Sequence, residues 1–177
     1  MTRIIAVLTV CGVILGGCLL SGCGYHIAGQ ADLMPKSIHT IYIEPFHNGA
    51  QRTDITRLLM AGLAREFISR THYKMVNDSR DADAVLAGAV TNVATGSTTA
   101  DPASGRSTGA LVLLQMNIYL TEKATGKMLF HRDGYEFRER YEISENPATY
   151  FDESSTAIQR VTRDAARSIV TAILENF

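Results

Sequence analysis

The stretch that decides the fold reads Val112-Leu113-Leu114-Gln115-Met116-Asn117-Ile118-Tyr119-Leu120-Thr121. Apolar side chains recur at every second position from Val112 to Leu120, and the positions from Gln115 to Thr121 that alternate with them are more polar. Successive side chains of a strand point to opposite faces of a sheet. The period therefore predicts a strand with one face toward a core and one wetter face.

The chain that follows this stretch predicts an antiparallel partner strand. Ala124-Thr125-Gly126 supplies a turn, and the range 127–143 is expected to return alongside the first strand. Its alternate positions carry the apolar or aromatic residues Leu129, Tyr135, Phe137 and Tyr141. The opposite positions include the charged residues Arg132, Glu136, Arg138 and Arg140, which predict a charged outer face.

The chain before this hairpin predicts three strands and one helix. Strands are expected over 38–46, 73–76 and 84–93, with Pro45 ending the first one and His47-Asn48-Gly49 forming a turn after it. The helix begins at a capping Thr53 or Asp54. Its apolar residues fall on one stripe and are Ile55, Leu58, Leu59, Leu63 and Phe67.

Two further segments complete the domain. The range 95–109 is rich in Thr, Ser, Gly and Ala and predicts either a mobile loop or a strand extension. Asn146-Pro147 predicts the start of a second helix that runs to the end of the chain. Two one-sided helices over one face of a mainly antiparallel sheet make a two-layer α+β sandwich.

The N-terminus has the order of a secretory signal. Arg3 precedes an uncharged, mostly apolar run from Ile4 to Leu20, and small residues follow it. Leu20-Ser21-Gly22-Cys23 resembles a bacterial lipobox, in which the cysteine thiol receives a diacylglycerol, the preceding peptide bond is cut and the new amino terminus is acylated. An uncleaved anchor is the alternative, because about 17 apolar residues lie at the lower limit of a spanning helix.

Cleavage before Cys23 predicts three parts: a signal peptide at 1–22, a lipidated tether at 23–36 and one α+β domain at 37–177. Cys11 and Cys18 leave with the signal, so neither a disulfide nor a cysteine metal site is expected. The whole chain has 17 basic and 18 acidic residues, a balance without general attraction for nucleic acid. By resemblance to lipoprotein sorting rules, Gly24 after the lipidated cysteine favours the outer membrane over the inner one.

The sequence offers little chemistry. No pair among the five histidines has helical i, i+4 spacing or lies beside a cysteine, so no metal site is predicted. Asp133 and Glu136 lie in an alternating charged strand and are interpreted as solvated ion-pair partners, not as a glycosidase pair. The absence of nucleophile, phosphate-binding and dinucleotide motifs favours a binding or assembly role over an enzyme.

Four segments carry a resemblance to a known family. In chain order they are Cys23-Gly24-Tyr25-His26-Ile27, Ile38-His39-Thr40-Ile41-Tyr42-Ile43-Glu44-Pro45-Phe46, Ala82-Asp83-Ala84-Val85-Leu86-Ala87-Gly88 and Thr125-Gly126-Lys127. Together they resemble the LptE family of lipopolysaccharide-assembly lipoproteins along nearly the whole mature chain. The resemblance implies two helices against a four-stranded sheet, no catalytic residues and no cofactor.

The same resemblance implies a function and partners. Members of the family act as a plug inside a large outer-membrane β-barrel of the LptD type, help that barrel assemble, and bind lipopolysaccharide on its way to the cell surface. The protein is accordingly expected to be lipid-anchored in the outer membrane, to face the periplasm and to lie within the barrel lumen.

Three basic residues are the candidates for lipopolysaccharide binding. Lipid A phosphates call for Arg or Lys donors with acyl contact nearby. Arg106 resembles in place a basic position that the family uses, and Lys123 and Lys127 across the predicted turn are further candidates. The alternative for all three is an ordinary solvated charge.

Two rival functions remain open at this point. Ile43-Glu44-Pro45-Phe46-His47-Asn48 also resembles outer-membrane lipoproteins that activate peptidoglycan synthases or build secretion pores, although the predicted C-terminal helix argues against that class. The other rival is a lipid-anchored periplasmic enzyme acting on envelope glycans, which requires a pocket with perturbed carboxylates.

Overall fold

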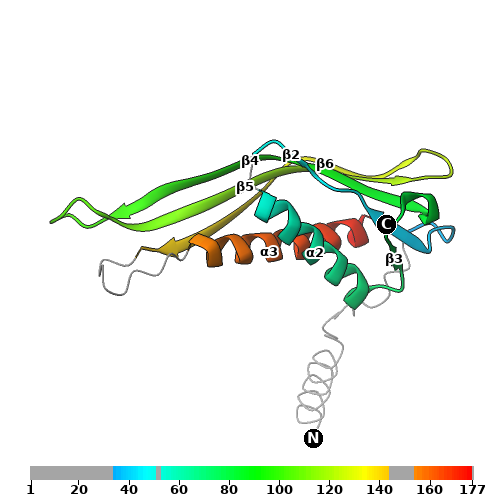
Figure 1. Ribbon diagram of the computed structural model, residues 1–177, viewed down its shortest axis with the longest axis horizontal. Helices are drawn as coiled ribbons and strands as arrows, with labels where there is room; N and C mark the ends of the chain where they lie inside the picture. Colours follow the sequence, from blue (N-terminus) through cyan, green and yellow to red (C-terminus); the bar gives the residue numbers. More distant parts are fainter. Residues whose placement is uncertain (1–33, 51–52, 144–153, 177) are drawn as a thin grey trace, which may run out of the picture. The chain divides into compact units, whose positions relative to one another are not determined.

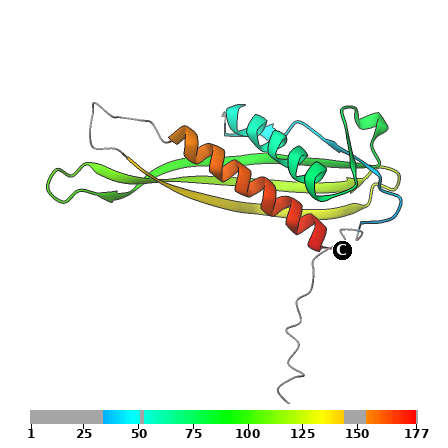
Figure 2. The same cartoon turned by 90° about the horizontal axis from the view of Figure 1, so that it is seen from below.

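The computed structural model describes residues 34–50, 53–143 and 154–176, all of which lie in the unit Ala31–Phe177. The strands are β1 Thr40–Ile43, β2 His47–Asn48, β3 Lys74–Val76, β4 Ala84–Ala100, β5 Ser107–Glu122 and β6 Met128–Glu142. The helices are α2 Thr53–Arg70, the short 3₁₀ turn η2 Ser79–Asp81 and α3 Ser154–Glu175. Figure 1 shows α2 and α3 on the same side of one long sheet, and the view from below in Figure 2 shows both helices in front of it. The predicted two-layer α+β arrangement with two helices is confirmed.

The sheet differs in detail from the prediction of four mainly antiparallel strands. It has six strands in the order β3-β1-β4-β5-β6, and β2 pairs with β4 off this path. β1 is parallel to both β3 and β4, and β2 is parallel to β4. The chain passes from β1 through β2 and then α2 to β3, and a helical crossover of this kind returns the chain in its original direction. The sheet is therefore mixed.

The predicted turn at His47-Asn48-Gly49 is instead the strand β2. His47 and Asn48 pair with Ala89 and Val90, and the Gly49 N–H donates to the carbonyl of Val90 at 3.0 Å. Phe46, just before β2, lies over Gly88, where a β-carbon would overlap the Phe46 ring. The side chain of Phe46 is 6% exposed. This close contact explains why the chain stays against β4 after Pro45.

The predicted periods of β5 and α2 are confirmed. On β5 the residues at alternate positions from Val112 to Leu120 are at most 1% exposed. On α2 the side chains of Ile55, Leu59, Leu63 and Phe67 are fully buried. The two helices approach closely at Gly62, where an added β-carbon would lie 2.9 Å from the β-carbon of Ala166 on α3.

A register shift near the middle of β6 divides the strand into two parts with different side-chain alternation, and a second shift lies near its start, beside Leu129. Met116 pairs with Tyr135 and Ile118 pairs with Arg132, so β6 has one residue more than β5 between these pairs. Gly134 at this bulge has φ +61 and donates its N–H to the Asn117 side chain at 2.9 Å. The prediction that Arg132 shares a face with Arg138 is therefore wrong. Arg132 is on the face of Ile118, and its guanidinium lies 4.3 Å from the centre of the Tyr135 ring.

The range 95–109 forms a strand extension, the second of its two predicted alternatives. β4 continues to Ala100, and β5 begins at Ser107. Several sequence predictions lie outside the described residues: the signal peptide, Cys23, most of the tether and the helix start at Asn146-Pro147. In the part of the chain that the structure describes, no helix has the length and apolar character needed to cross a membrane.

Candidate functional site

The three basic residues predicted to bind lipopolysaccharide lie in two separate places. Arg106 directly precedes β5, whereas Lys123 directly follows it and Lys127 comes after the next turn. β5 has 16 residues. At about 3.4 Å per residue such a strand spans about 50 Å. Arg106 and the two lysines therefore cannot contact one phosphate group together.

The hairpin tip holds Arg106 in an ordered turn. The carbonyl of Asp101 accepts from the Gly105 N–H at 2.8 Å, and Gly105 has the positive φ of +67 that favours glycine. The Ser104 hydroxyl and then the Ala103 N–H donate to the Asp101 carboxylate and lower its pKa. The Arg106 backbone closes this turn while its side chain is exposed. The turn thus presents a guanidinium at the far end of the hairpin.

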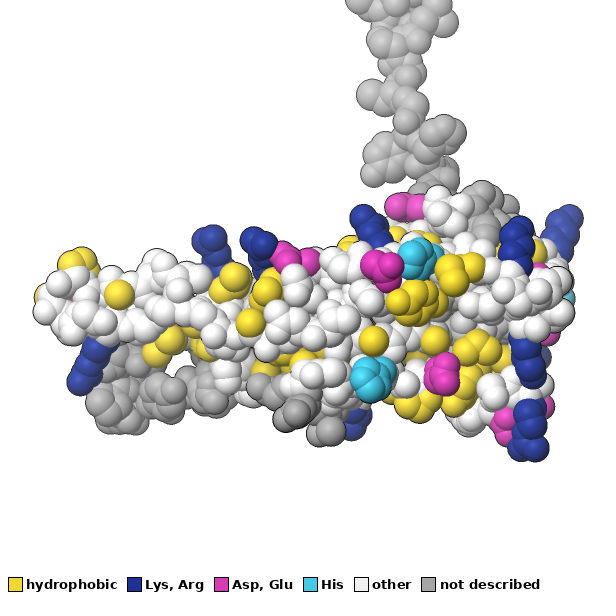
Figure 3. Space-filling model, turned by 90° about the horizontal axis from the view of Figure 1, so that it is seen from above, with side chains coloured by type: hydrophobic (Ala, Val, Ile, Leu, Met, Phe, Trp, Pro, Cys, Tyr) yellow, Lys and Arg dark blue, Asp and Glu magenta, His cyan; other side chains and the backbone are white. Residues whose placement is uncertain are grey.

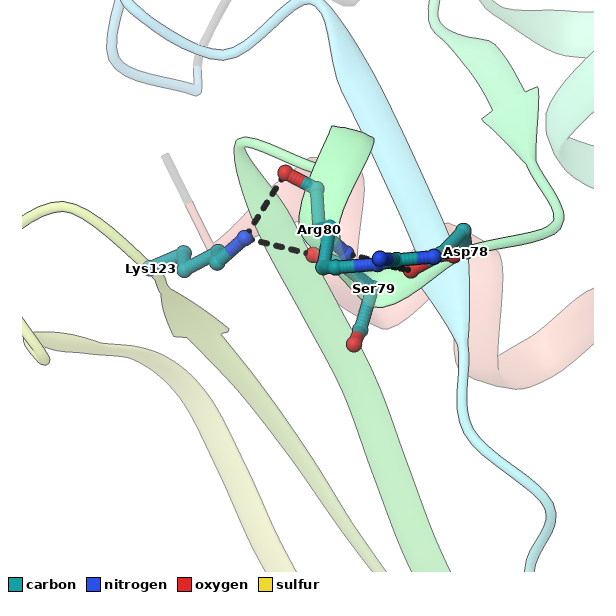
Figure 4. A network of polar contacts seen from close by, with 4 residues as sticks. All are labelled: Asp78, Ser79, Arg80 and Lys123. Atoms are coloured by element: carbon teal, nitrogen blue, oxygen red, sulfur yellow. Dashed lines mark hydrogen bonds and ion pairs between the residues drawn. The ribbon is translucent and has the colours of Figure 1, made fainter.

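At the other end of β5, Lys123 is already engaged by the backbone. Its Nζ donates to the carbonyl oxygens of Ser79 at 2.7 Å and Arg80 at 2.9 Å, both on η2 (Figure 4). An ammonium group has three donors, so two of them are used here. Asp78 begins η2 by accepting from the Arg80 N–H, and the Arg80 side chain lowers the pKa of Asp78. Lys123 therefore fastens the β5–β6 turn to η2.

The turn between β5 and β6 is built around Glu122 and leaves Lys127 exposed. The Thr125 hydroxyl, followed by the Ser37 hydroxyl, donates to the Glu122 carboxylate and lowers its pKa. The Glu122 N–H donates to the Lys127 carbonyl at 2.8 Å. Among the described residues, the Lys127 ammonium has no hydrogen bond or ion pair to a side chain. It is the freer of the two lysines.

A hollow of about 270 Å³ lies beside this turn. It is lined by Ser37, Ile38, Ala82, Asp83, Glu122, Lys123 and Ala124. Asp83, one of these lining residues, joins β1 to β4: its Oδ2 accepts from the N–H groups of His39 and Thr40 at 2.8 and 2.9 Å. The His39 hydrogen bond is the largest cause of a lowered Asp83 pKa. The carboxylates here are shifted toward the ionised form, which is the reverse of the raised pKa of a general acid.

The face of the sheet away from the helices carries basic and apolar side chains next to each other. Leu111 and Leu113 on β5 are half-buried on this face, and their partners on β6 are Arg140 and Arg138. Figure 3 shows Lys and Arg side chains along one border of this face with hydrophobic side chains beside them. Arg138 forms an ion pair with Glu136, whose pKa is lowered first by Gln115 and then by Arg138. We call Leu111, Leu113, Arg138 and Arg140 the outer strip.

Sequence reasoning missed the apolar half of the outer strip. The signal was present, because Leu111 and Leu113 occupy the positions in β5 that alternate with core residues, in phase with Gln115 and Asn117. Two leucines on the wetter face of a strand add apolar surface beside the arginines of β6. The described residues contain no group of three or more His, Cys, Asp or Glu side chains placed to hold a metal ion.

These features define an α+β sandwich domain that offers charged and apolar surface for binding. Solved structures with this fold include lipoprotein B from Nitrosomonas europaea, at 18% identity and a TM-score of 0.57, covering 86% of this chain and 96% of that one. The rare lipoprotein B from Shewanella oneidensis is similar at 15% identity and a TM-score of 0.51, covering 76% of this chain and 94% of that one. No curated protein matches the chain.

The family model described as LptE, lipopolysaccharide-assembly, matches residues 38–173. The chain belongs to the LptE family. This is a family of lipoproteins without enzymatic activity, and membership makes the chain a lipopolysaccharide-assembly lipoprotein in that general sense.

Proposed function

We propose that the protein is an outer-membrane lipoprotein that plugs and helps assemble a lipopolysaccharide-inserting β-barrel of the LptD type, and that it binds lipopolysaccharide during delivery. The observation that carries this proposal is the family match over 38–173, which includes every described strand and most of α3. The presence of α3 also disfavours the synthase-activator and secretion-pore class, which usually lacks a long terminal helix.

Glycolipid binding is proposed to use the exposed basic side chains at the two ends of β5. Phosphate groups prefer guanidinium and ammonium donors, and acyl chains need apolar surface close to them. Arg106 and Lys127 supply exposed charges, whereas two of the Lys123 donors are held by η2. The outer strip adds two arginines beside two half-buried leucines. Arg106, Lys127 and the outer strip are therefore the first positions to test.

Attachment to the membrane is proposed through Cys23. The lipobox-like Leu20-Ser21-Gly22-Cys23 supports lipidation. Several fatty chains, each worth about 0.8 kcal/mol per buried methylene, make such an anchor effectively permanent. Gly24 supports sorting to the outer membrane.

The proposed function is tested by co-purification. The tagged chain is expressed together with the lipopolysaccharide-assembly barrel of the same organism, extracted in mild detergent and captured. We expect the barrel in equal molar amount with the chain, and we expect depletion of the chain to leave the barrel misassembled. Recovery of the chain alone, or with a peptidoglycan synthase instead, would refute the proposal.

A further inference from the structure

Along part of β4, one side of the strand has no neighbour among the described strands. β4 pairs on one side with β1 at Ala84–Leu86 and with β2 at Ala89–Val90, and among the described residues nothing pairs with that side beyond Val90. Its other side pairs with β5 as far as Ala100. Register shifts occur between Val90 and Asn92 and again after Ser97, so residues 92–97 are regular strand between them. We call residues 92–97 the open edge.

The open edge differs in charge from β6, which is an outer strand of the sheet. Seven of the fifteen residues of β6 are charged, and the Arg160 side chain from α3 also donates to the Arg140 carbonyl on its outer side. Charged side chains are a common protection of an edge strand against pairing with another chain. The open edge has neither a charged residue nor a proline. In Figure 3 the hairpin end of the molecule is mostly white, the colour of backbone and of side chains that are neither charged nor hydrophobic.

The backbone groups that the open edge offers follow from the register. The carbonyl of Leu86 accepts from the Glu44 N–H and the carbonyl of Val90 from the Gly49 N–H, so both carbonyls point away from β5. The register shift after Val90 moves this outward direction from the even-numbered to the odd-numbered residues. The residues that turn their N–H and C=O outward are therefore Val93, Thr95 and Ser97. Their side chains share the helix face with the β5 core residues, and those of Asn92 and Ala94 share the outer face. An incoming strand would meet three donor–acceptor pairs that no described strand uses.

The outer face beside the open edge carries two leucines and has room for large side chains. Gly96 and Ala94 lie opposite Leu111 and Leu113, which are half-buried. A β-carbon at Gly96 would meet no atom within 4 Å. Large apolar or aromatic side chains on a neighbouring strand commonly cover a glycine of this kind. The open edge thus fits an uncharged strand with large apolar residues at alternate positions.

We propose that the open edge binds an extended, uncharged segment of the β-barrel partner by β-strand addition. The inference rests on the proposed function for the identity of the partner. A strand of six residues covers far less than the roughly 1,000 Å² of a stable interface, so a second copy of this chain has too little to bind. A barrel that also contacts the chain elsewhere supplies the remaining area, and its segment extends the sheet at β4.

The test compares two substitutions at one position. Thr95→Pro removes an outward N–H without removing a hydrogen bond to β5, because proline is tolerated at the open side of an edge strand. Thr95→Ala keeps the N–H and is the matched control. Co-purification with the co-expressed barrel is expected to fall about fivefold for Thr95→Pro, in line with one lost hydrogen bond and a steric block. Thr95→Ala is expected to recover as much barrel as the unmodified chain.

A second variant guards against misfolding. Gly96→Lys places a charge in open space on the outer face, and the same loss of barrel is expected with an unchanged thermal unfolding curve. Equal recovery of barrel by all variants would overturn the inference while leaving the proposed function intact. Failure of the unmodified chain to recover barrel would refute the proposed function itself. Dimers of the isolated chain that Thr95→Pro dissociates, seen by sedimentation, would assign the open edge to a second copy and overturn the inference.

Discussion

Arg106 is the residue at which glycolipid binding is most directly tested. Its exposed guanidinium stands at the hairpin tip, and exposed charge pairs contribute about 1 kcal/mol or less. Arg106→Ala is therefore expected to weaken binding of purified protein to fluorescent lipopolysaccharide about fivefold. Arg163→Ala, at an exposed position of α3, is the control and is expected to bind normally. Equal affinity of both variants for lipopolysaccharide would show that Arg106 is an ordinary solvated surface charge.

Lys123 is predicted to contribute to the stability of the fold, whereas Lys127 is predicted to contribute to lipopolysaccharide binding. Lys123→Ala removes both hydrogen bonds to the carbonyls of η2 and is expected to lower the free energy of unfolding by about 1 kcal/mol. Lys127→Ala is expected to leave unfolding unchanged and to weaken lipopolysaccharide binding. Urea unfolding and the same binding measurement separate the two effects. A stable Lys123→Ala variant that loses affinity would assign the glycolipid to Lys123 after all.

Asp83 is predicted to make stability depend on acid. The hydrogen bond from the His39 N–H is the main cause that lowers its pKa below the ordinary value of 3.8. A carboxylate with a lower pKa in the folded than in the unfolded chain stabilises the fold at pH values above its pKa in the unfolded chain. This stabilisation is lost as the pH falls through its pKa in the folded chain. The stability difference between the unmodified protein and Asp83→Asn should be constant from pH 7 to about pH 5 and shrink below about pH 4. Urea unfolding across this range measures it, and a difference that grows on acidification would contradict the assignment.

At the scale of elements, the contact between α2 and α3 depends on a small residue. An added β-carbon at Gly62 already lies 2.9 Å from Ala166, so Gly62→Leu would force the helices apart. Overpacking of this kind costs about 2 kcal/mol. Ala61→Leu, at the exposed neighbouring position of α2, is the control. Thermal unfolding should separate the two variants clearly, and equal melting temperatures would show that the helices adjust without cost.

The elements that sequence reasoning predicted are those with local periods. Val112 to Leu120 alternate because each second side chain enters the core, and the stripe of α2 follows from its turn of 3.6 residues. The parallel pairing of β1 with β3 and β4 depends on contacts distant in sequence, which no local pattern encodes. His47-Asn48 has turn-forming residues, but tertiary pairing with β4 overrides that preference.

The individual residues of the candidate site could be predicted from the sequence, but their positions relative to one another could not. Arg106, Lys123 and Lys127 stand out as basic residues at turns, yet the sequence does not show that the length of β5 separates them. Lys123 donates to η2 residues more than forty positions away in the sequence, so no local sequence pattern predicts these hydrogen bonds. Leu111 and Leu113 could have been found, because apolar residues at those positions depart from the alternation expected for a wetter face.

At the scale of the whole molecule, the N-terminal anchor is predicted to hold the protein on the membrane. Cys23→Ser removes the proposed lipid attachment site, so we expect the protein to leave the membrane fraction or to retain an unprocessed signal peptide. Cys18→Ser lies within the expected signal peptide and should change neither result. Membrane fractionation and intact-mass measurement check both variants. An unmodified protein whose mass shows an unacylated Cys23 would contradict the prediction.

The bulge at Gly134 has a consequence for how this protein can vary. Side chains alternate between the two faces of the sheet along β6. The loss or gain of one residue would therefore shift the register and move Arg138 and Arg140 from the solvent-exposed face to the core face. Only at this bulge and at the second register shift, beside Leu129, is one residue already surplus, so only there can the strand shorten without exchanging its faces. Differences in length among relatives should therefore collect at these two points of β6 and be rare along the rest of the strand.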